Sequence, residues 1–301
     1  MDKKIMSIAP SFNCSLKCEG CYLTSDVSRE MRDATKDDYY WNRAMEEGVR
    51  AGFNELAITL NPFPGAVEHT TKLAKMAKSN GFKTVNVTAT HKSFEEFGEK
   101  QTELVNAIDI LSISVDDQRF NSFTHAEKTI SSIDDFLSDL DYYEQGKILN
   151  INLLWTPTVF AWFKDDQESF EENFSLLTCW REDAGPGGNP GITVQHLIYK
   201  PLSLYKSAEW FWENYRFVFE NAKEVKIAGN GTDQIGDVAL GNLMGMNMCP
   251  GRTMVDIDPM GFVRKCPENP EAYDGTNLAK LRTLLKTGVP GCDKAKCNCI
   301  I

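Results

Sequence analysis

The sequence predicts an α/β fold with a parallel sheet, for three reasons. Short runs rich in Ile, Val, Leu and Thr alternate with segments of helical periodicity over roughly the first 220 residues. The 301 residues suit one large domain, or one with a small appendage. Hydrophobic residues make up 42% and charged residues 25%, as in globular proteins, which excludes a disordered or low-complexity chain.

The predicted elements follow from this alternation. Strands are expected at 5–9, 55–60, 84–90, 108–115, 148–155 and 192–199. Helices are expected at 37–50, 66–79, 94–106, 126–144, 166–179 and 207–222. Strands alternating with helices form βαβ units, and we expect helices to cover both faces of the sheet. Reactive groups should then gather beyond the carboxyl ends of the strands.

A boundary is expected where the alternation stops. The glycine-rich segment 229–251 carries little periodicity, so we predict two units, 1–225 and 226–301. Within the second unit, 253–265 is typical of a β-hairpin around a Pro-Met-Gly turn. A helix is expected at 277–286, followed by a cysteine-rich tail.

Charge and hydropathy exclude several functions. The net charge of −11 disfavours binding to nucleic acids and to anionic membrane surfaces. An acidic surface suits cations, although it also serves solubility alone. No apolar run is long enough to span a membrane, and the start lacks the apolar stretch of a signal peptide. We therefore expect a cytoplasmic protein.

Nine cysteines are too many to be disulfides by default in a reducing compartment, so their spacing indicates metal or redox chemistry. Cys14, Cys18 and Cys21 form the pattern C-x3-C-x2-C directly after the first strand. Three thiolates can bind three irons of a [4Fe–4S] cluster and leave the fourth iron for another ligand. Structural zinc would need a fourth ligand, and the next histidine is His69.

With this motif the sequence resembles the radical S-adenosylmethionine superfamily, over most of residues 5–222. The resemblance implies a partial (β/α)6 barrel in which Cys14, Cys18 and Cys21 hold the cluster. It implies that S-adenosylmethionine chelates the unique iron through its amino and carboxylate groups. One electron, from a donor such as flavodoxin or ferredoxin, then yields a 5′-deoxyadenosyl radical that abstracts hydrogen from a C–H bond.

The resemblance also suggests contacts for S-adenosylmethionine. Gly20, before the third cysteine, would touch adenine through its backbone, with Tyr22 following. The family's Gly-Gly-Glu motif is missing after the second strand, so Thr59 or Asn61 would bind the methionine amine instead. Polar groups at the end of the fourth strand would contact the ribose, and the candidates there are Ser114 and Asp116.

The C-terminal cysteines resemble the small "twitch" or SPASM extension, which binds an auxiliary [4Fe–4S] cluster. The five candidates are Cys249, Cys266, Cys292, Cys297 and Cys299. They suffice for one auxiliary cluster, which makes two clusters in total; a zinc ribbon is the alternative. The last four could form the ligand set and leave Cys249 as a hydrogen donor, or Cys249 could be the first ligand. Cys179 is most simply a buried thiol.

Small enzymes with this extension include those that act on aminosugars, such as the epimerase of neomycin C. We therefore expect epimerisation of a cationic, aminoglycoside-like substrate in antibiotic biosynthesis. The alternatives are dehydrogenation of a small molecule and modification of a ribosomal peptide; a non-catalytic iron–sulfur protein would leave the three-cysteine motif without a use. The acidic residues expected near the site are Asp116, Asp117, Asp165, Asp166, Asp256, Asp258 and Glu268.

Overall fold

A computed structural model of the chain describes residues 4–16, 18, 27–90, 92–93, 101–115, 123–155, 165, 192–198, 233–235, 254–265 and 271–290. Within these ranges, none of the helices has the length and apolar character needed to cross a membrane.

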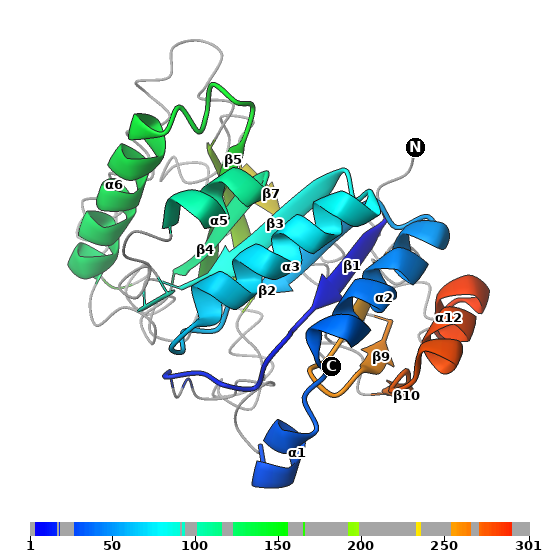
Figure 1. Ribbon diagram of the computed structural model, residues 1–301. Coiled ribbons are helices and arrows are strands. Elements are labelled where there is room, and N and C mark those ends of the chain that lie inside the picture. The colour runs from blue at the N-terminus through cyan, green and yellow to red at the C-terminus, as the bar shows by residue number, and fades with distance from the viewer. Residues whose placement is uncertain are drawn as a thin grey trace.

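The described strands form one sheet in the order β10-β9-β8-β1-β2-β3-β4-β5-β6-β7 (Figure 1). The six predicted strands are confirmed as β1 Ile5–Ile8, β2 Glu55–Thr59, β3 Thr84–Ala89, β4 Ile110–Val115, β5 Ile148–Trp155 and β6 Ile192–Ile198. They pair in parallel in chain order, as the strands of a partial (β/α)6 barrel do. The sequence patterns missed β7 Asp233–Ile235, which pairs in parallel with β6 and is too short to show periodicity.

The described helices are α1 Arg29–Asp33, α2 Asp38–Arg50, α3 Ala66–Asn80, α5 Gln101–Ala107, α6 Phe123–Asp139 and α12 Leu278–Thr287. All of them correspond to predicted helices except the short helix α1, which the sequence patterns missed. The side chains of Asp37 and Asn277 cap α2 and α12 at their N-termini. Helix α6 ends five residues before the predicted 144, and Asp141 then takes a positive φ of 52°. The predicted helices 166–179 and 207–222 lie outside the described residues.

The two faces of the sheet differ in chemistry. Alternate residues of β1 to β5, such as Ile8, Ile58, Val87 and Ile113, are buried in one apolar core with α2, α3 and α6. The other face, here called the polar face, carries Ser7, Thr59, Asn86, Thr88, Ser112, Ser114, Asn150, Asn152 and Asp256. The described helices α2, α3 and α6 pack on the apolar face. The expectation that helices cover both faces stays a prediction, because the predicted helices 166–179 and 207–222 lie outside the described residues.

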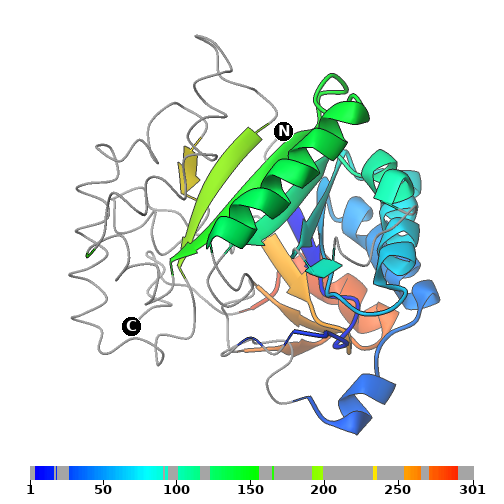
Figure 2. The same ribbon diagram turned by 90° about the vertical axis from the view of Figure 1, so that its left-hand side faces the viewer.

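The C-terminal hairpin belongs to the same sheet. Strand β8, Met254–Ile257, pairs in parallel with β1, and β9, Phe262–Arg264, pairs antiparallel with β8. Figure 2 shows these strands, in orange, beside the blue strand β1. Strand β10, Tyr273–Asp274, extends the edge beyond β9. The hairpin prediction is confirmed, whereas the predicted boundary at 225–226 lies outside the described residues.

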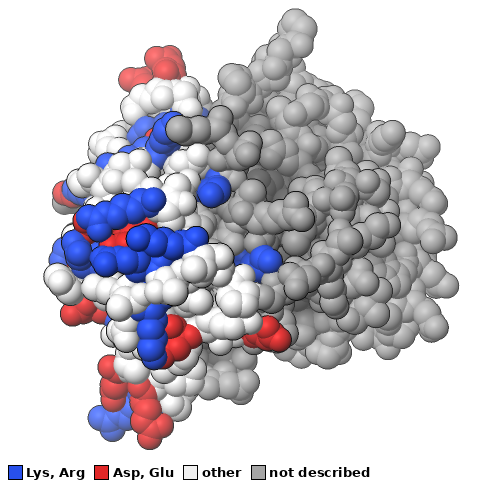
Figure 3. Space-filling model, turned by 90° about the vertical axis from the view of Figure 1, so that its right-hand side faces the viewer, with Lys and Arg blue, Asp and Glu red and all other residues white. Residues whose placement is uncertain are grey.

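Helix α2 anchors the segment that follows β10 and the helix α12 after it. The Tyr40 hydroxyl donates to the carbonyl of Gly275 at 2.8 Å in a buried position. The Arg282 guanidinium of α12 donates to both oxygens of Glu47, at 2.8 and 2.7 Å. Glu47 is 3% exposed, and its pKa is lowered chiefly by these hydrogen bonds from Arg282. Figure 3 views the molecule from the side of α2 and α12 and shows basic side chains gathered around acidic ones there.

We predict that Tyr40→Phe lowers the free energy of unfolding by about 1–3 kcal/mol, because it leaves the buried carbonyl of Gly275 without its donor. Urea denaturation would measure the change. Tyr39→Phe is the matched control, since Tyr39 lies on the same helix and is 67% exposed; its effect should stay within about 0.5 kcal/mol. Equal effects of the two substitutions would contradict the anchoring role.

Candidate functional site

The cysteine loop begins at the carboxyl edge of the sheet. It follows β1, and the backbone N–H of Ala9 continues the pairing by donating to the carbonyl of Ile257 at 3.0 Å. Cys14 and Cys18 are both half-buried in this loop, whereas Cys21 lies outside the described residues. Two of the three predicted cluster ligands are therefore placed at the edge where parallel α/β proteins collect their functional groups.

The loop after β2 holds the cysteine loop in place. The N–H of Ser15 donates to the carbonyl of Pro62 at 2.7 Å. The side-chain amide of Asn61 donates to the carbonyl of Ser11 at 2.9 Å. Asn61, predicted to bind S-adenosylmethionine, thus uses its amide nitrogen to position the loop that carries Cys14 and Cys18. Thr59, the other candidate there, is half-buried on the polar face.

A hydrogen-bonded ladder crosses the polar face from β3 to β5. The Ser112 hydroxyl donates to Asn86 Oδ1 at 2.9 Å, and Asn150 Nδ2 donates both to Ser112 and to Asn152 Oδ1 at 3.1 Å. Ser114, predicted to lie near ribose, is buried on this face and stands in register with Asn152. We did not predict the ladder, although the period-2 spacing of Asn and Ser in β3, β4 and β5 is its signal.

A second polar group lies on the other side of the cysteine loop. Asp256 in β8 stands in register with Ser7 in β1 and opposite Arg264 in β9. Asp258, at the carboxyl end of β8, accepts from the N–H groups of Met260 and Phe262, each at 3.0 Å. Its other oxygen pairs with the guanidinium of Arg264, also at 3.0 Å. The two carboxyls therefore differ in their hydrogen bonding, because both oxygens of Asp258 have partners that close the hairpin turn.

Burial raises the pKa of Asp256 to about 6. The Ser7 hydroxyl and the charge of Arg264 oppose this rise, and the charge of Asp258 adds to it. Asp256 is 1% exposed, and its Oδ1 has no hydrogen-bond partner among the described residues. A buried carboxyl with one oxygen that lacks a donor destabilises a fold and is typical of functional sites.

The remaining predicted site residues lie outside the described residues. For S-adenosylmethionine these are Gly20, Tyr22 and Asp116; for the clusters and hydrogen donation they are Cys21, Cys249, Cys266, Cys292, Cys297 and Cys299. Their roles stay predictions. Within the described part of the chain, no group of three or more His, Cys, Asp or Glu side chains is arranged to hold a metal ion.

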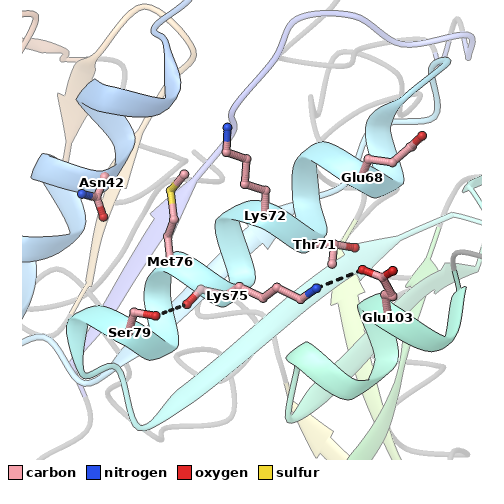
Figure 4. A pocket seen from close by; sticks show the side chains of 8 residues that line it. All are labelled: Asn42, Glu68, Thr71, Lys72, Lys75, Met76, Ser79 and Glu103. Carbon is pink, nitrogen blue, oxygen red and sulfur yellow. Dashed lines mark hydrogen bonds and ion pairs between the residues drawn. The ribbon is translucent and has the colours of Figure 1, made fainter.

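A groove on the helical side of the sheet is separate from this site. It lies over α3, between α2 and α5, and Figure 4 shows its lining side chains. Lys75 pairs with Glu103 across it at 2.9 Å, and Lys72 pairs with Asp38. Because these lysines already have acidic partners and the groove lies behind the apolar face of the sheet, we assign it no role in the chemistry.

Comparison with known proteins gives only distant likenesses. No family model and no curated protein matches the sequence. Among solved structures, the chain is similar to a tagged form of anSMEcpe with bound AdoMet, at 14% identity over 88% of this chain and 74% of that one, with a TM-score of 0.49. Native anSMEcpe with bound AdoMet matches at 12% identity over 87% and 74%, with a TM-score of 0.46. Likenesses this distant assign no activity.

We predict that Asp256 makes the protein less stable as pH rises. Its carboxyl titrates near pH 4 when unfolded and near pH 6 when folded, so its contribution to stability is complete below about pH 4 and lost on passing pH 6. The full loss is on the order of 3 kcal/mol. The Asp256→Asn variant should not show this loss, because its amide does not titrate. In urea denaturation its free energy of unfolding should therefore rise relative to that of the wild type between pH 4 and pH 7.

Glu103→Gln is the control for this titration, because Glu103 is an exposed carboxylate on the helical side. Its unfolding free energy should follow that of the wild type through the same pH range. If the curve for Asp256→Asn also ran parallel to the wild type, the raised pKa of Asp256 would be wrong.

Proposed function

We propose that this chain is a radical S-adenosylmethionine enzyme. One observation carries the proposal: the C-x3-C-x2-C motif begins in the loop after the first strand of a parallel α/β sheet, at its carboxyl edge. Three thiolates suit a [4Fe–4S] cluster with one open iron, and the open iron suits a cofactor that has to be bound and cleaved. A fully ligated structural site would need a fourth thiolate or imidazole in the loop.

The described residues of the loop fit such a group. Cys14 and Cys18 are half-buried, so their thiols combine access with partial shelter from water. Ser11 and Ser15 fix the loop backbone against the loop after β2. When bound, the cluster and S-adenosylmethionine supply a radical that abstracts hydrogen from an unactivated C–H bond. The chain's own task is to hold the thiolates and to place the substrate over the polar face.

For the reaction, we propose epimerisation of a carbon in an aminoglycoside-like substrate. The net charge of −11 and the buried carboxyl of Asp256 support a cationic substrate. Cys249 would return hydrogen from its S–H bond to the opposite face of the substrate radical. The resulting thiyl radical regains hydrogen by taking up one electron and one proton, with the electron from a donor such as flavodoxin or ferredoxin.

An alternative reaction depends on the number of cysteines that follow the barrel. Five are present and one [4Fe–4S] cluster needs four, so Cys249 is either the spare thiol or a ligand of an auxiliary cluster. If Cys249 is a ligand, the reaction is better written as dehydrogenation of a small molecule or of a ribosomal peptide. In that case the auxiliary cluster would accept the electron released by the substrate radical.

Replacing Cys14, Cys18 and Cys21 together by Ala should abolish 5′-deoxyadenosine formation from S-adenosylmethionine in the anaerobically reconstituted, reduced protein, because the open-iron cluster is lost. Liquid chromatography with mass detection measures this product, and Cys179→Ala is the matched control. Persistent 5′-deoxyadenosine in the triple variant would overturn the proposed function. Bound iron should fall by about four atoms per chain in the triple variant and stay unchanged in the control.

Cys249→Ala separates the two reactions. If Cys249 is the hydrogen donor, the variant should retain full iron and form 5′-deoxyadenosine without epimer. The wild type in D2O should then place one deuterium at the inverted carbon, because the thiol exchanges with solvent. If Cys249 is a ligand, iron should fall by about half, as expected for loss of one of two clusters. Iron analysis and mass spectrometry of the product decide between these outcomes.

A further inference from the structure

Asp256 is the buried carboxyl whose hydrogen bonding the described structure leaves incomplete. It is 1% exposed, yet no donor among the described residues reaches its Oδ1. The only other such atom in the described part is Trp41 Nε1, on helix α2 behind the apolar face. A buried oxygen without a donor destabilises the protein by about 1–3 kcal/mol, so its retention calls for a reason.

The neighbouring described side chains do not donate to this oxygen. The guanidinium of Arg264 is bonded to Asp258, and the remaining oxygen of Asp258 closes the hairpin turn. Farther along the same face, Asn86, Ser112 and Asn150 are bonded to one another. Asp256 thus accepts a hydrogen bond from Ser7 and keeps one oxygen, Oδ1, without a donor in the described part of the chain.

The location of Asp256 connects it with the cysteine loop. Its strand, β8, lies directly beside β1, and the pairing continues to Ala9, where the chain leaves the sheet toward Cys14. Asp256 also shares the polar face with Thr59, Thr88 and Ser114. Asp256 is therefore the described carboxyl that combines a place on this face, beside the strand leading to the cysteine loop, with an oxygen that lacks a donor.

We propose that Asp256 binds a protonated amine of the substrate on the polar face. An ammonium group supplies the hydrogen-bond donor that Oδ1 lacks, and its positive charge adds to that of Arg264 in stabilising the buried carboxylate. The pairing is strong because the site excludes water. This inference rests on the proposed function and deepens it, since it assigns the recognition of a cationic substrate to one residue and excludes Asp258 from that role.

Equilibrium dialysis of neomycin against the reconstituted protein, at pH 7.5 and low salt, tests the proposal. Asp256→Asn keeps the shape of the side chain and removes the charge, so the Kd for neomycin should rise by about tenfold or more. Glu103→Gln removes one negative charge from the far side of the sheet and should leave the Kd unchanged. Neomycin acetylated on all amines should bind equally weakly to wild type and Asp256→Asn.

Three results would overturn the assignment. One is the same Kd for neomycin in wild type and Asp256→Asn; another is no binding of neomycin to the wild type. The third is weakened binding of S-adenosylmethionine to Asp256→Asn with unchanged binding of neomycin, which would transfer the contact to the cofactor. Circular dichroism confirms that the variant is folded. Formation of 5′-deoxyadenosine by the wild type is measured separately, so failure of the proposed function is distinguished from failure of this inference.

Discussion

Strand β1 pairs in parallel on both sides, with β2 and with β8, and the arrangement of the candidate site depends on this double pairing. Parallel strands end at the same edge, so the cysteine loop after β1 emerges between the loop after β2 and the turn after β8. Segments about 250 residues apart in the chain thereby form one site. A separate C-terminal unit would have left β1 as an exposed edge strand, with unpaired backbone groups beside the cysteines.

The division of the sheet into an apolar and a polar face separates stability from function. The apolar face, together with α2, α3 and α6, forms the continuous core. On the polar face Asn86, Ser112 and Asn150 are hydrogen-bonded to one another, so the ladder stabilises one arrangement of β3 to β5. Asp256 departs from this pattern. Its carboxyl destabilises the fold, yet it is present beside the strand that leads to the loop of Cys14.

Helix α2 keeps the two halves of the site in register. Its outer side holds the C-terminal hairpin and helix through Tyr40 and Glu47, and its inner side packs Trp41 and Met45 into the core below β1. The pair of Glu47 with Arg282 is bidentate, and its carboxylate is buried. This geometry fixes the direction from which α12 approaches α2. Movement of α12 relative to the core would therefore break the contacts of Tyr40 and Glu47 on the outer side of α2.

The sequence by itself determined the six strands, most helices and the hairpin, because hydrophobic periodicity and turn residues act locally. It also located Cys14 and Cys18 after β1, since motif spacing is a property of adjacent residues. Only the tertiary structure decided that β8 pairs with β1, that Asn61 holds the cysteine loop and that Oδ1 of Asp256 lacks a donor among the described residues. These facts depend on contacts between distant segments. The hydrophobic periodicity of a single strand does not determine which strand will pair with it.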